Sequence, residues 1–336
     1  MWMNSANLAG VGGSHRIEVQ RKVEFLRHTV AVQVSSLFRR HRPVMVAAIL
    51  VAVLATGCNG GTRPTLTDER LVETPDSAAA PTVAGATAGT AEESAGTAAR
   101  GPGEVEALVV EVLEIFPHDT TASTQGLELH NGVFLESTGL YGRSDIRRVD
   151  PATGNVLQVI PIDQQFFAEG LTRVDDQVIQ LTWLENTAFY WDAATLERIK
   201  EVSYPGDGWG LCYDGSRLIM TDGTPQLIFR DPMTFDETGR IPVTLNGQEV
   251  YNLNELECVN GMVWANIWQT ELIARIDPAT GVVTGLVDAI TLDAPTEPES
   301  AVLNGIAWDA STQSFYVTGK LWPNMYRVNF VPAPTG

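Results

Sequence analysis

The chain has 336 residues, of which 44% are hydrophobic and 8% aromatic, and its 22 basic and 41 acidic residues give a formal charge of −19. This acidic balance argues against a nucleic-acid partner, because there is no basic stripe to neutralise phosphates.

Residues 1–57 have the features of an export signal. Residues 1–43 carry seven basic residues and end in RRHRP, and the apolar run VMVAAILVAVLA follows from Val44 to Ala55. Twelve apolar residues are too few to span a bilayer, which needs about 20, but they suit the apolar region of a secretory signal. The charged segment is long for such a signal, so we expect the true start to lie within it.

The signal ends in LATGC, which resembles a bacterial lipobox with Cys58 as the acylated residue. Ala55 replaces the Leu that is usual three residues before the cysteine, so an ordinary cleaved signal is the alternative. We expect an exported cell-surface or periplasmic lipoprotein that contacts the membrane only through this anchor. Loss of residues 1–57 removes seven basic and two acidic residues, which leaves 15 and 39 and a formal charge of −24.

Residues 58–103 are predicted to be a disordered tether. From Asn59 to Gly103 the chain consists mainly of Ala, Thr, Gly, Pro, Ser and Glu. Such a composition cannot bury enough apolar surface to fold.

A short motif restarts five times in residues 104–336. The copies are TQGLEL at Thr124, AEGLTR at Ala168, GWGLCY at Gly208, LNELEC at Leu253 and LNGIAW at Leu303. Aligned on their third residues, they are separated by 44, 40, 45 and 50 residues. This spacing is the period of a β-propeller blade.

Two further motifs recur in phase with the first. The second lies thirteen residues later, at Gly139, Trp183, Gly223 and Trp268. The third is an aspartate-centred turn at Asp150, Asp192, Asp231 and Asp277, with VNF at Asn329 as a weak fifth copy. Turn residues at fixed offsets between apolar runs predict hairpins.

We therefore predict an all-β, five-bladed propeller with four antiparallel strands per blade. The run EALVVEVLEIF, from Glu106 to Phe116, is expected to pair with the last blade and close the ring, which removes exposed strand edges. Cys212 and Cys258 follow their motifs by two and three residues, on opposite strand faces. We expect them to be buried free thiols and the domain to be monomeric.

The first and second motifs are expected to meet at one mouth of the central channel, because the innermost strand and its neighbour are antiparallel. The residues placed there, which we call the funnel, are Gln125, Glu169, Trp183, Trp209, Asp222, Asn254, Trp268, Asn304 and Lys320. Aromatic rings around a few polar groups are the usual composition of a ligand site. The alternative is a purely structural role, in which Lys320 is a solvated lysine at the rim and the tryptophans only pack between blades.

The sequence offers few residues for a catalytic zinc site or for a serine nucleophile. After residue 57 the only histidines are His118 and His130, which lack zinc-type spacing, and there is no GxSxG turn. We expect no metal at the catalytic site. The sequence leaves open whether a structural calcium ion binds in the channel.

Ten motifs between residues 118 and 323 resemble one family. HDTTASTQGL, ESTGLYGRS, FFAEGLT, QLTW, GWGL, TDGT, LNELE, ANIW, LNGIAWD and VTGKLWP occur in this order. They are similar to the plant-type and bacterial glutamine cyclotransferases, a family of five-bladed propellers. This resemblance implies that the α-amine of an N-terminal glutamine attacks its own carboxamide, releasing ammonia and leaving pyroglutamate, with peptides or proteins as substrates.

The resemblance also implies functional residues. The family's residues fall on Gln125, Glu169, Trp183, Trp209, Asn254, Trp268 and Lys320. Glu169 is expected to act as base and then acid once desolvation raises its pKa, while Gln125, Asn254 or Lys320 would stabilise the oxyanion. Ser123, Ala168 and Cys258 depart from the family's pattern and bear on substrate fit.

Two other functions stay open from the residues alone. Glu169, Asn254, Asn304 and Asp222 would make a passable calcium site, as in propeller lactonases. A non-catalytic surface propeller could bind a ligand or protein in the same funnel.

Overall fold

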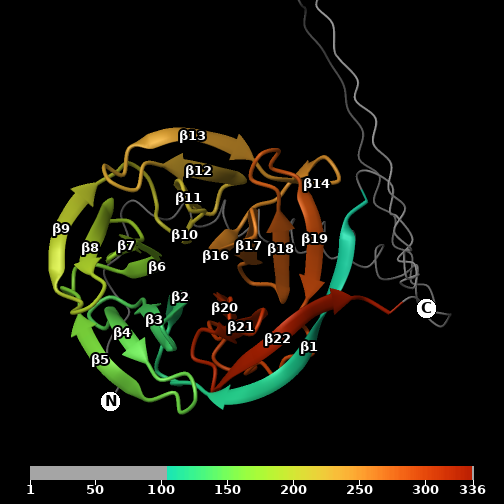
Figure 1. The fold of residues 1–336 in the computed structure, drawn as a ribbon, viewed down its shortest axis with the longest axis horizontal. Helices are drawn as coiled ribbons and strands as arrows, with labels where there is room; N and C mark the ends of the chain where they lie inside the picture. The colour runs from blue at the N-terminus through green and yellow to red at the C-terminus, as the bar shows by residue number, and fades with distance from the viewer. Residues whose placement is uncertain (1–103, 335–336) are drawn as a thin grey trace, which may run out of the picture. The chain divides into compact units, whose positions relative to one another are not determined.

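The structure, a computed structural model, describes residues 104–334, which form an all-β domain (Figure 1). The expected signal segment, the tether and Cys58 lie outside the described residues. Three four-stranded antiparallel sheets follow one another along the chain. Their strands are β2 (Thr124–His130), β3 (Val133–Thr138), β4 (Asp145–Val149) and β5 (Val156–Pro161); β6 (Ala168–Val174), β7 (Gln177–Thr182), β8 (Thr187–Asp192) and β9 (Arg198–Ser203); and β10 (Leu211–Tyr213), β11 (Leu218–Met220), β12 (Gln226–Arg230) and β13 (Glu237–Pro242).

The remaining strands include a small hairpin and a larger sheet. The hairpin consists of β14 (Thr244–Leu245) and β15 (Gln248–Glu249). The larger sheet has the order β16-β17-β18-β19-β1-β22-β21-β20. Its strands are β1 (Glu106–Pro117), β16 (Leu253–Val259), β17 (Met262–Ile267), β18 (Leu272–Ile276), β19 (Val283–Asp288), β20 (Leu303–Asp309), β21 (Ser314–Gly319) and β22 (Asn324–Pro332).

The sheets are arranged as a ring, in agreement with a propeller (Figure 1). Toward the middle of the ring lie β2, β6, β10, β16 and β20, and toward its rim lie β5, β9, β13, β19 and β1. The rim strands β5, β9 and β13 alternate between exposed and half-buried residues, the period-two pattern of a strand with one covered face. The inner strands β2, β6 and β16 begin with four or five buried residues. The burial pattern thus places the starts of the inner strands in the interior.

β1 pairs with the last strands of the chain, as the sequence led us to expect. It runs antiparallel to β22, from Leu108 opposite Pro332 to Pro117 opposite Asn324. β1 also pairs in parallel with β19 from Glu106 to Val109, which was not expected. This second pairing joins two four-stranded groups into the eight-stranded sheet and covers the edge of β19.

The glycine of the first motif is explained by the close approach of neighbouring inner strands. The N–H of Gly170 donates to the carbonyl of Trp209 at 2.7 Å. A Cβ on Gly170 would lie 2.5 Å from that same carbonyl oxygen, and one on Gly210 would collide with the backbone of Asn254. A side chain at either position would therefore force the inner strands apart.

The third motif forms turns at four of its five predicted positions. The carboxylates of Asp150, Asp192, Asp231 and Asp277 each accept a hydrogen bond from the backbone N–H two residues later, at 2.8–2.9 Å. The fifth prediction is wrong, because Asn329 lies inside β22, opposite Glu111 of β1. No turn is needed there, since β1 supplies the outer strand.

The expectation of free thiols is also wrong. Cys212 and Cys258 form a disulfide whose Cα atoms lie 5.5 Å apart. Cys212 of β10 packs among core residues of β16 to β19, and Cys258 of β16 packs against the same cluster. Neighbouring sheets stack face to face, so cysteines on opposite faces of successive sheets meet instead of pointing apart.

Within residues 104–334, no helix is long and apolar enough to cross a membrane.

Candidate active site

Backbone hydrogen bonds bring the first and second motifs to one end of the inner strands. Trp183, just after β7, donates its N–H to the carbonyl of Phe167, just before β6, at 2.9 Å. Lys320 makes the equivalent bond to Val302, also at 2.9 Å. The residues that flank these strand ends therefore share one mouth of the ring.

Glu169 is the second residue of β6 and only 6% exposed. Burial raises the pKa of its carboxyl group to about 8; the Lys320 ammonium opposes the shift, and the Glu185 and Asp207 carboxylates add to it. Its own backbone carbonyl accepts from Ser137 Oγ at 2.5 Å, which fixes this part of β6 to β3. Glu169 is thus a carboxyl group that can both take and give a proton near neutral pH.

Lys320 lies directly after β21 and is half-buried. Burial lowers the pKa of its ammonium group, against the attraction of Glu169, which raises it. The two groups influence each other's pKa, so the structure brings together the base and the cation predicted from sequence. Two charges in this setting interact more strongly than they would in water.

Two of the predicted tryptophans pack against each other. The rings of Trp209 and Trp268 meet edge to face at 5.5 Å between centroids. Gly223, which has φ +77°, lies under the Trp209 ring, and a Cβ there would be 2.6 Å from it. The second-motif glycine therefore makes room for the first-motif indole of the same sheet.

The third tryptophan belongs to a different row of rings. Trp183 packs against Phe167 at 5.5 Å, and Phe167 packs against Tyr141 at 5.4 Å. Tyr141 is 49% exposed, whereas Phe167 and Trp183 are half-buried. This row of three rings, the aromatic row, leads from the neighbourhood of Glu169 toward solvent.

Buried amide and indole groups at the funnel have polar atoms without partners. Among residues 104–334, no hydrogen-bond partner is found for Oε1 of Gln125, Oδ1 of Asn254, Oδ1 of Asn304 or Nε1 of Trp209. Gln125, Asn254 and Asn304 are at most 3% exposed. Buried polar atoms are nearly always satisfied, so the four at this mouth fit a polar ligand; five more such atoms occur among residues 104–334.

Asp222 is held by its own turn. Its Oδ1 accepts from the N–H of Thr224 at 3.0 Å and from the Thr224 hydroxyl at 2.5 Å. This bonding is that of an aspartate turn, which gives the carboxylate a local structural task.

Sequence reasoning missed four residues near Glu169, namely Tyr141, Phe167, Glu185 and Asp207. The Glu185 and Asp207 carboxylates act on Glu169, and Glu185 also accepts hydrogen bonds from Tyr141 and from the N–H of Phe167. Phe167 stands two residues before Glu169 and Glu185 two after Trp183, so their positions in the motifs were the available signal. Tyr141 follows the second motif of the preceding sheet.

Other buried carboxylates link inner strands. Glu255 accepts from the N–H groups of Leu127 and Ile306 at 3.2 and 2.8 Å. Glu128 accepts from the N–H of Arg173 at 2.6 Å. Burial raises the pKa of both carboxyl groups. These bonds connect β16 to β2 and β20, and β2 to β6, which is a structural role.

His118 is held by structural partners. Its ring nitrogens lie 2.8 Å from the Trp322 carbonyl oxygen and 3.1 Å from Glu136 Oε1. Burial alone would lower the pKa of His118, but the Glu136 carboxylate reverses the effect and raises it. Among residues 104–334 there is no group of three or more His, Cys, Asp or Glu side chains placed to hold a metal ion.

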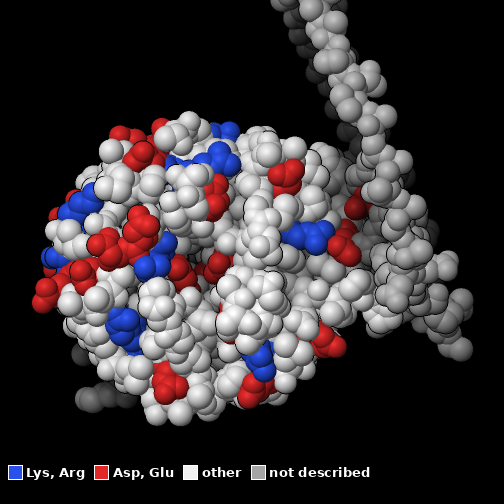
Figure 2. Space-filling model, viewed as in Figure 1, with Lys and Arg blue, Asp and Glu red and all other residues white. Residues whose placement is uncertain are grey.

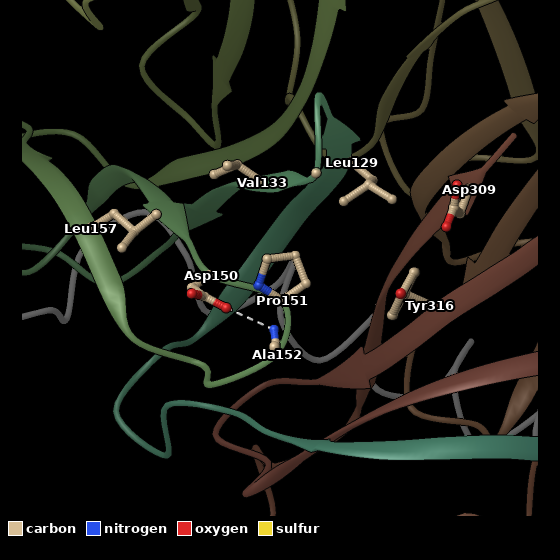
Figure 3. Close-up of a pocket in the computed structure, with 9 residues that line it drawn as sticks. Leu129, Val133, Asp150, Pro151, Ala152, Leu157, Asp309 and Tyr316 are labelled. Atoms are coloured by element: carbon tan, nitrogen blue, oxygen red, sulfur yellow. Dashed lines mark hydrogen bonds between the residues drawn. The ribbon is translucent and has the colours of Figure 1, made fainter. Parts of the chain in front are cut away.

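A pocket of about 300 Å³ lies at the other end of the inner strands (Figure 3). Leu129 and Asp309, which line it, follow Gln125 by four residues and Asn304 by five. The Asp150 carboxylate at its edge accepts from the N–H of Ala152 at 2.8 Å, an ordinary turn contact. The pocket is therefore separate from the funnel.

The fold and the funnel define a class: a propeller-like all-β protein whose candidate site combines a buried carboxyl group, an ammonium group, amides and indoles. The chain belongs to the glutamine cyclotransferase family, whose sequence profile matches residues 81–330. Over 230 residues it is 44% identical to a glutaminyl-peptide cyclotransferase of Arabidopsis thaliana, covering 67% of this chain and 72% of the plant protein. The crystal structure of Myxococcus xanthus glutaminyl cyclase matches with a TM-score of 0.65 and 38% identity, covering 69% of this chain and 100% of that one. The family prediction is confirmed.

Proposed function

We propose that this protein converts the N-terminal glutamine of peptides and proteins to pyroglutamate in the funnel, with Glu169 as the proton carrier. The observation that carries the proposal is the buried Glu169 carboxyl group beside Lys320, with a pKa raised to about 8. The family membership supports the reaction, and the geometry supports the assignment of roles.

Glu169 acts first as a base and then as an acid. Its carboxylate takes a proton from the α-ammonium group of the substrate, and the freed amine attacks the side-chain carbonyl carbon of the same glutamine. As the ring closes, the attacking nitrogen releases a second proton to solvent. The tetrahedral intermediate then collapses: the C–N bond to the former amide nitrogen breaks while protonated Glu169 gives its proton to that nitrogen. Ammonia leaves, the five-membered lactam remains, and Glu169 is again ionised.

The buried amides and the Lys320 ammonium group bind the substrate and stabilise the oxyanion. Negative charge develops on the carboxamide oxygen, and the Lys320 ammonium group, which interacts with Glu169, would stabilise it. The unpartnered oxygens of Gln125, Asn254 and Asn304 are acceptors for the N–H groups of the substrate. Trp209 Nε1 is an unpartnered donor at the same mouth.

The indoles hold the glutamine in the geometry for ring closure. Nucleophile and electrophile belong to one residue, so restricting its rotation replaces much of the chemical assistance that a bimolecular reaction would need. Trp183, Trp209 and Trp268 also displace water around Glu169, which sustains its raised pKa. Asp222 would help to position these tryptophans through the turn that it stabilises.

Catalysis is proposed to use no metal or other cofactor. The proton transfers need only Glu169 and solvent water, and the charge stabilisation needs only Lys320 and neutral donors. A structural calcium ion in the channel would be compatible with this chemistry. A calcium-dependent lactonase, the earlier alternative, has no support from the family match.

The proposed architecture is a five-bladed propeller closed by β1. The blades would be β2–β5, β6–β9, β10–β13, β16–β19, and β20–β22 with β1 as the outer strand. The antiparallel register of β1 with β22 supports this closure, and the repeated first motif at the start of each inner strand supports the blade count.

The protein is further proposed to act outside the cytoplasm as a monomeric lipoprotein anchored through Cys58. The signal-like segment and the LATGC sequence support export and acylation. The disulfide between Cys212 and Cys258 supports an oxidising compartment, where structural disulfides form and persist.

The test is a mass measurement on the full chain with glutaminyl peptides. Wild-type protein is expected to remove about 17 mass units, the mass of ammonia, and Glu169→Gln to lower kcat by roughly 10²–10⁴-fold with little change in binding. Glu197→Gln, a matched change at an exposed site of the same sheet, should leave the rate unchanged. Mass loss from none of several peptides would point to a non-catalytic binding protein, and near wild-type turnover in folded Glu169→Gln would remove Glu169 as the proton carrier.

A further inference from the structure

Two loops from neighbouring sheets meet beside Glu169. Tyr141 lies between β3 and β4, and Glu185 lies between β7 and β8. The Tyr141 hydroxyl donates to Glu185 Oε1 at 2.7 Å, and the N–H of Phe167 donates to Glu185 Oε2 at 3.2 Å. The carboxylate is therefore fixed by two donors on elements that are far apart in sequence.

This pair occupies the outer end of the site. Tyr141 is 49% exposed and forms the solvent end of the aromatic row, while Glu185 is half-buried. The Tyr141 ring packs at 5.4 Å against Phe167, which stands two residues before Glu169, and the charge of Glu169 contributes to the raised pKa of the Tyr141 hydroxyl. A peptide whose first residue sits against Glu169 must place its second residue near this outer end.

We propose that Tyr141 and Glu185 form a subsite for the side chain of the second substrate residue and that this subsite favours Lys or Arg over Asp or Glu. The inference rests on the proposed function, since it assumes that the first residue is the cyclising glutamine. It adds a specificity determinant outside the residues that carry out the reaction.

The chemistry of the pair explains the preference. A half-exposed tyrosine ring next to a fixed carboxylate attracts a cation both through the ring face and through charge. The long side chains of Lys and Arg can lay their methylene groups along the ring while the charged end stays wet. The Asp207 carboxylate also acts on Glu169 and raises its pKa. Figure 2 shows acidic and basic side chains interspersed on one face of the domain.

An acidic second residue meets the opposite situation. Its carboxylate would lie near Glu185, whose two donors are already used, and like charges at this distance repel. A partly exposed charge pair changes binding only modestly, so we expect a ratio of kcat/KM between Gln-Lys and Gln-Glu peptides of roughly fivefold at low salt. The ratio should shrink as salt is added.

The experiment measures this ratio in the full chain with peptides that differ only in their second residue. Glu185→Gln keeps the size of the side chain and removes its charge, so the ratio should fall toward one. Glu197→Gln removes one charge from an exposed turn of the same sheet and should leave the ratio unchanged, which controls for net charge. Tyr141→Leu should lower kcat/KM for Gln-Lys and Gln-Phe peptides more than for Gln-Gly.

The outcomes separate this inference from the proposed function. Ammonia release from no peptide would contradict the function. Cyclisation of all peptides with a wild-type ratio near one, or a ratio that Glu185→Gln and Glu197→Gln change equally, would overturn the subsite alone.

Discussion

The raised pKa of Glu169 suits proton transfer but lowers the stability of the folded protein at high pH. Burial raises the pKa of its carboxyl group to about 8, so near neutral pH a large fraction is protonated. Base catalysis needs the ionised form, while proton donation to the leaving nitrogen needs the protonated form. A pKa close to the working pH supports both steps.

The pH dependence of kcat/KM should therefore rise up to about pH 8 and then level off. The substrate amine also titrates near 7.7–8.0, so a single profile mixes the two groups. Variants separate them, because they change the enzyme and not the peptide. Lys320→Met removes the cation that lowers the pKa of Glu169 and should move the rise to higher pH, whereas Glu185→Gln removes an anion and should move it to lower pH. Shifts in the same direction would contradict the assignment.

Glu169 should also make the folded protein less stable in alkali. A carboxyl group whose pKa is raised in the folded state holds its proton there while the unfolded chain has lost it, so stability falls from about pH 4.5 to about pH 8 and stays low above that. Glu169→Gln removes this effect. We expect a melting temperature above that of wild type at pH 9 and a difference that vanishes near pH 4, measured by thermal unfolding at both pH values. A difference independent of pH would show that charge burial is not the cause.

At the scale of elements, local sequence explains strands and turns but not which faces meet. The aspartate turns could be predicted because each depends on residues next to one another in sequence, as at Asp150. The first-motif glycines were visible because the same close approach of inner strands repeats along the chain, as at Gly170. The disulfide was missed because Cys212 and Cys258 had to be judged across two stacked sheets. Glu185 and Tyr141 were missed for the same reason, since their hydrogen bond joins loops of neighbouring sheets. The extra parallel pairing of β1 with β19 has no signal in the repeat.

The disulfide should stabilise the domain by linking β10 to β16. It closes a loop with a sequence separation of 46 residues, and disulfides of this kind typically contribute about 2–4 kcal/mol. For a domain of this size, reduction should lower the melting temperature by roughly 5–15 °C. The double variant Cys212→Ser/Cys258→Ser should melt at the lower temperature with and without dithiothreitol. A wild-type protein that melts equally with and without reductant would argue against the bond.

For the whole molecule, the arrangement of buried groups bears on metal dependence. Within residues 104–334 the two least exposed carboxylates already have partners, because Glu255 accepts from two backbone N–H groups and Glu136 bonds to His118 and Thr124. We expect cyclisation to survive EDTA and o-phenanthroline, apart from any effect of a structural calcium ion on stability. Activity and melting temperature are measured together after chelation. Activity that is lost at an unchanged melting temperature and restored by one added metal would contradict metal-free catalysis.

The location of the whole protein depends on Cys58, which lies outside the described residues. If Cys58 is acylated, its acyl chains provide the attachment, at about 0.8 kcal/mol for each buried CH₂ group. The remaining chain, with a formal charge of −24, has no electrostatic attraction to anionic lipid. We therefore expect the full chain in the membrane fraction, released by detergent and not by high salt, and Cys58→Ser in the soluble exported fraction with unchanged cyclisation rate. Equal partitioning of both forms into the aqueous phase would show that the signal is cleaved without acylation, as the small residues Ala55 and Gly57 would also allow.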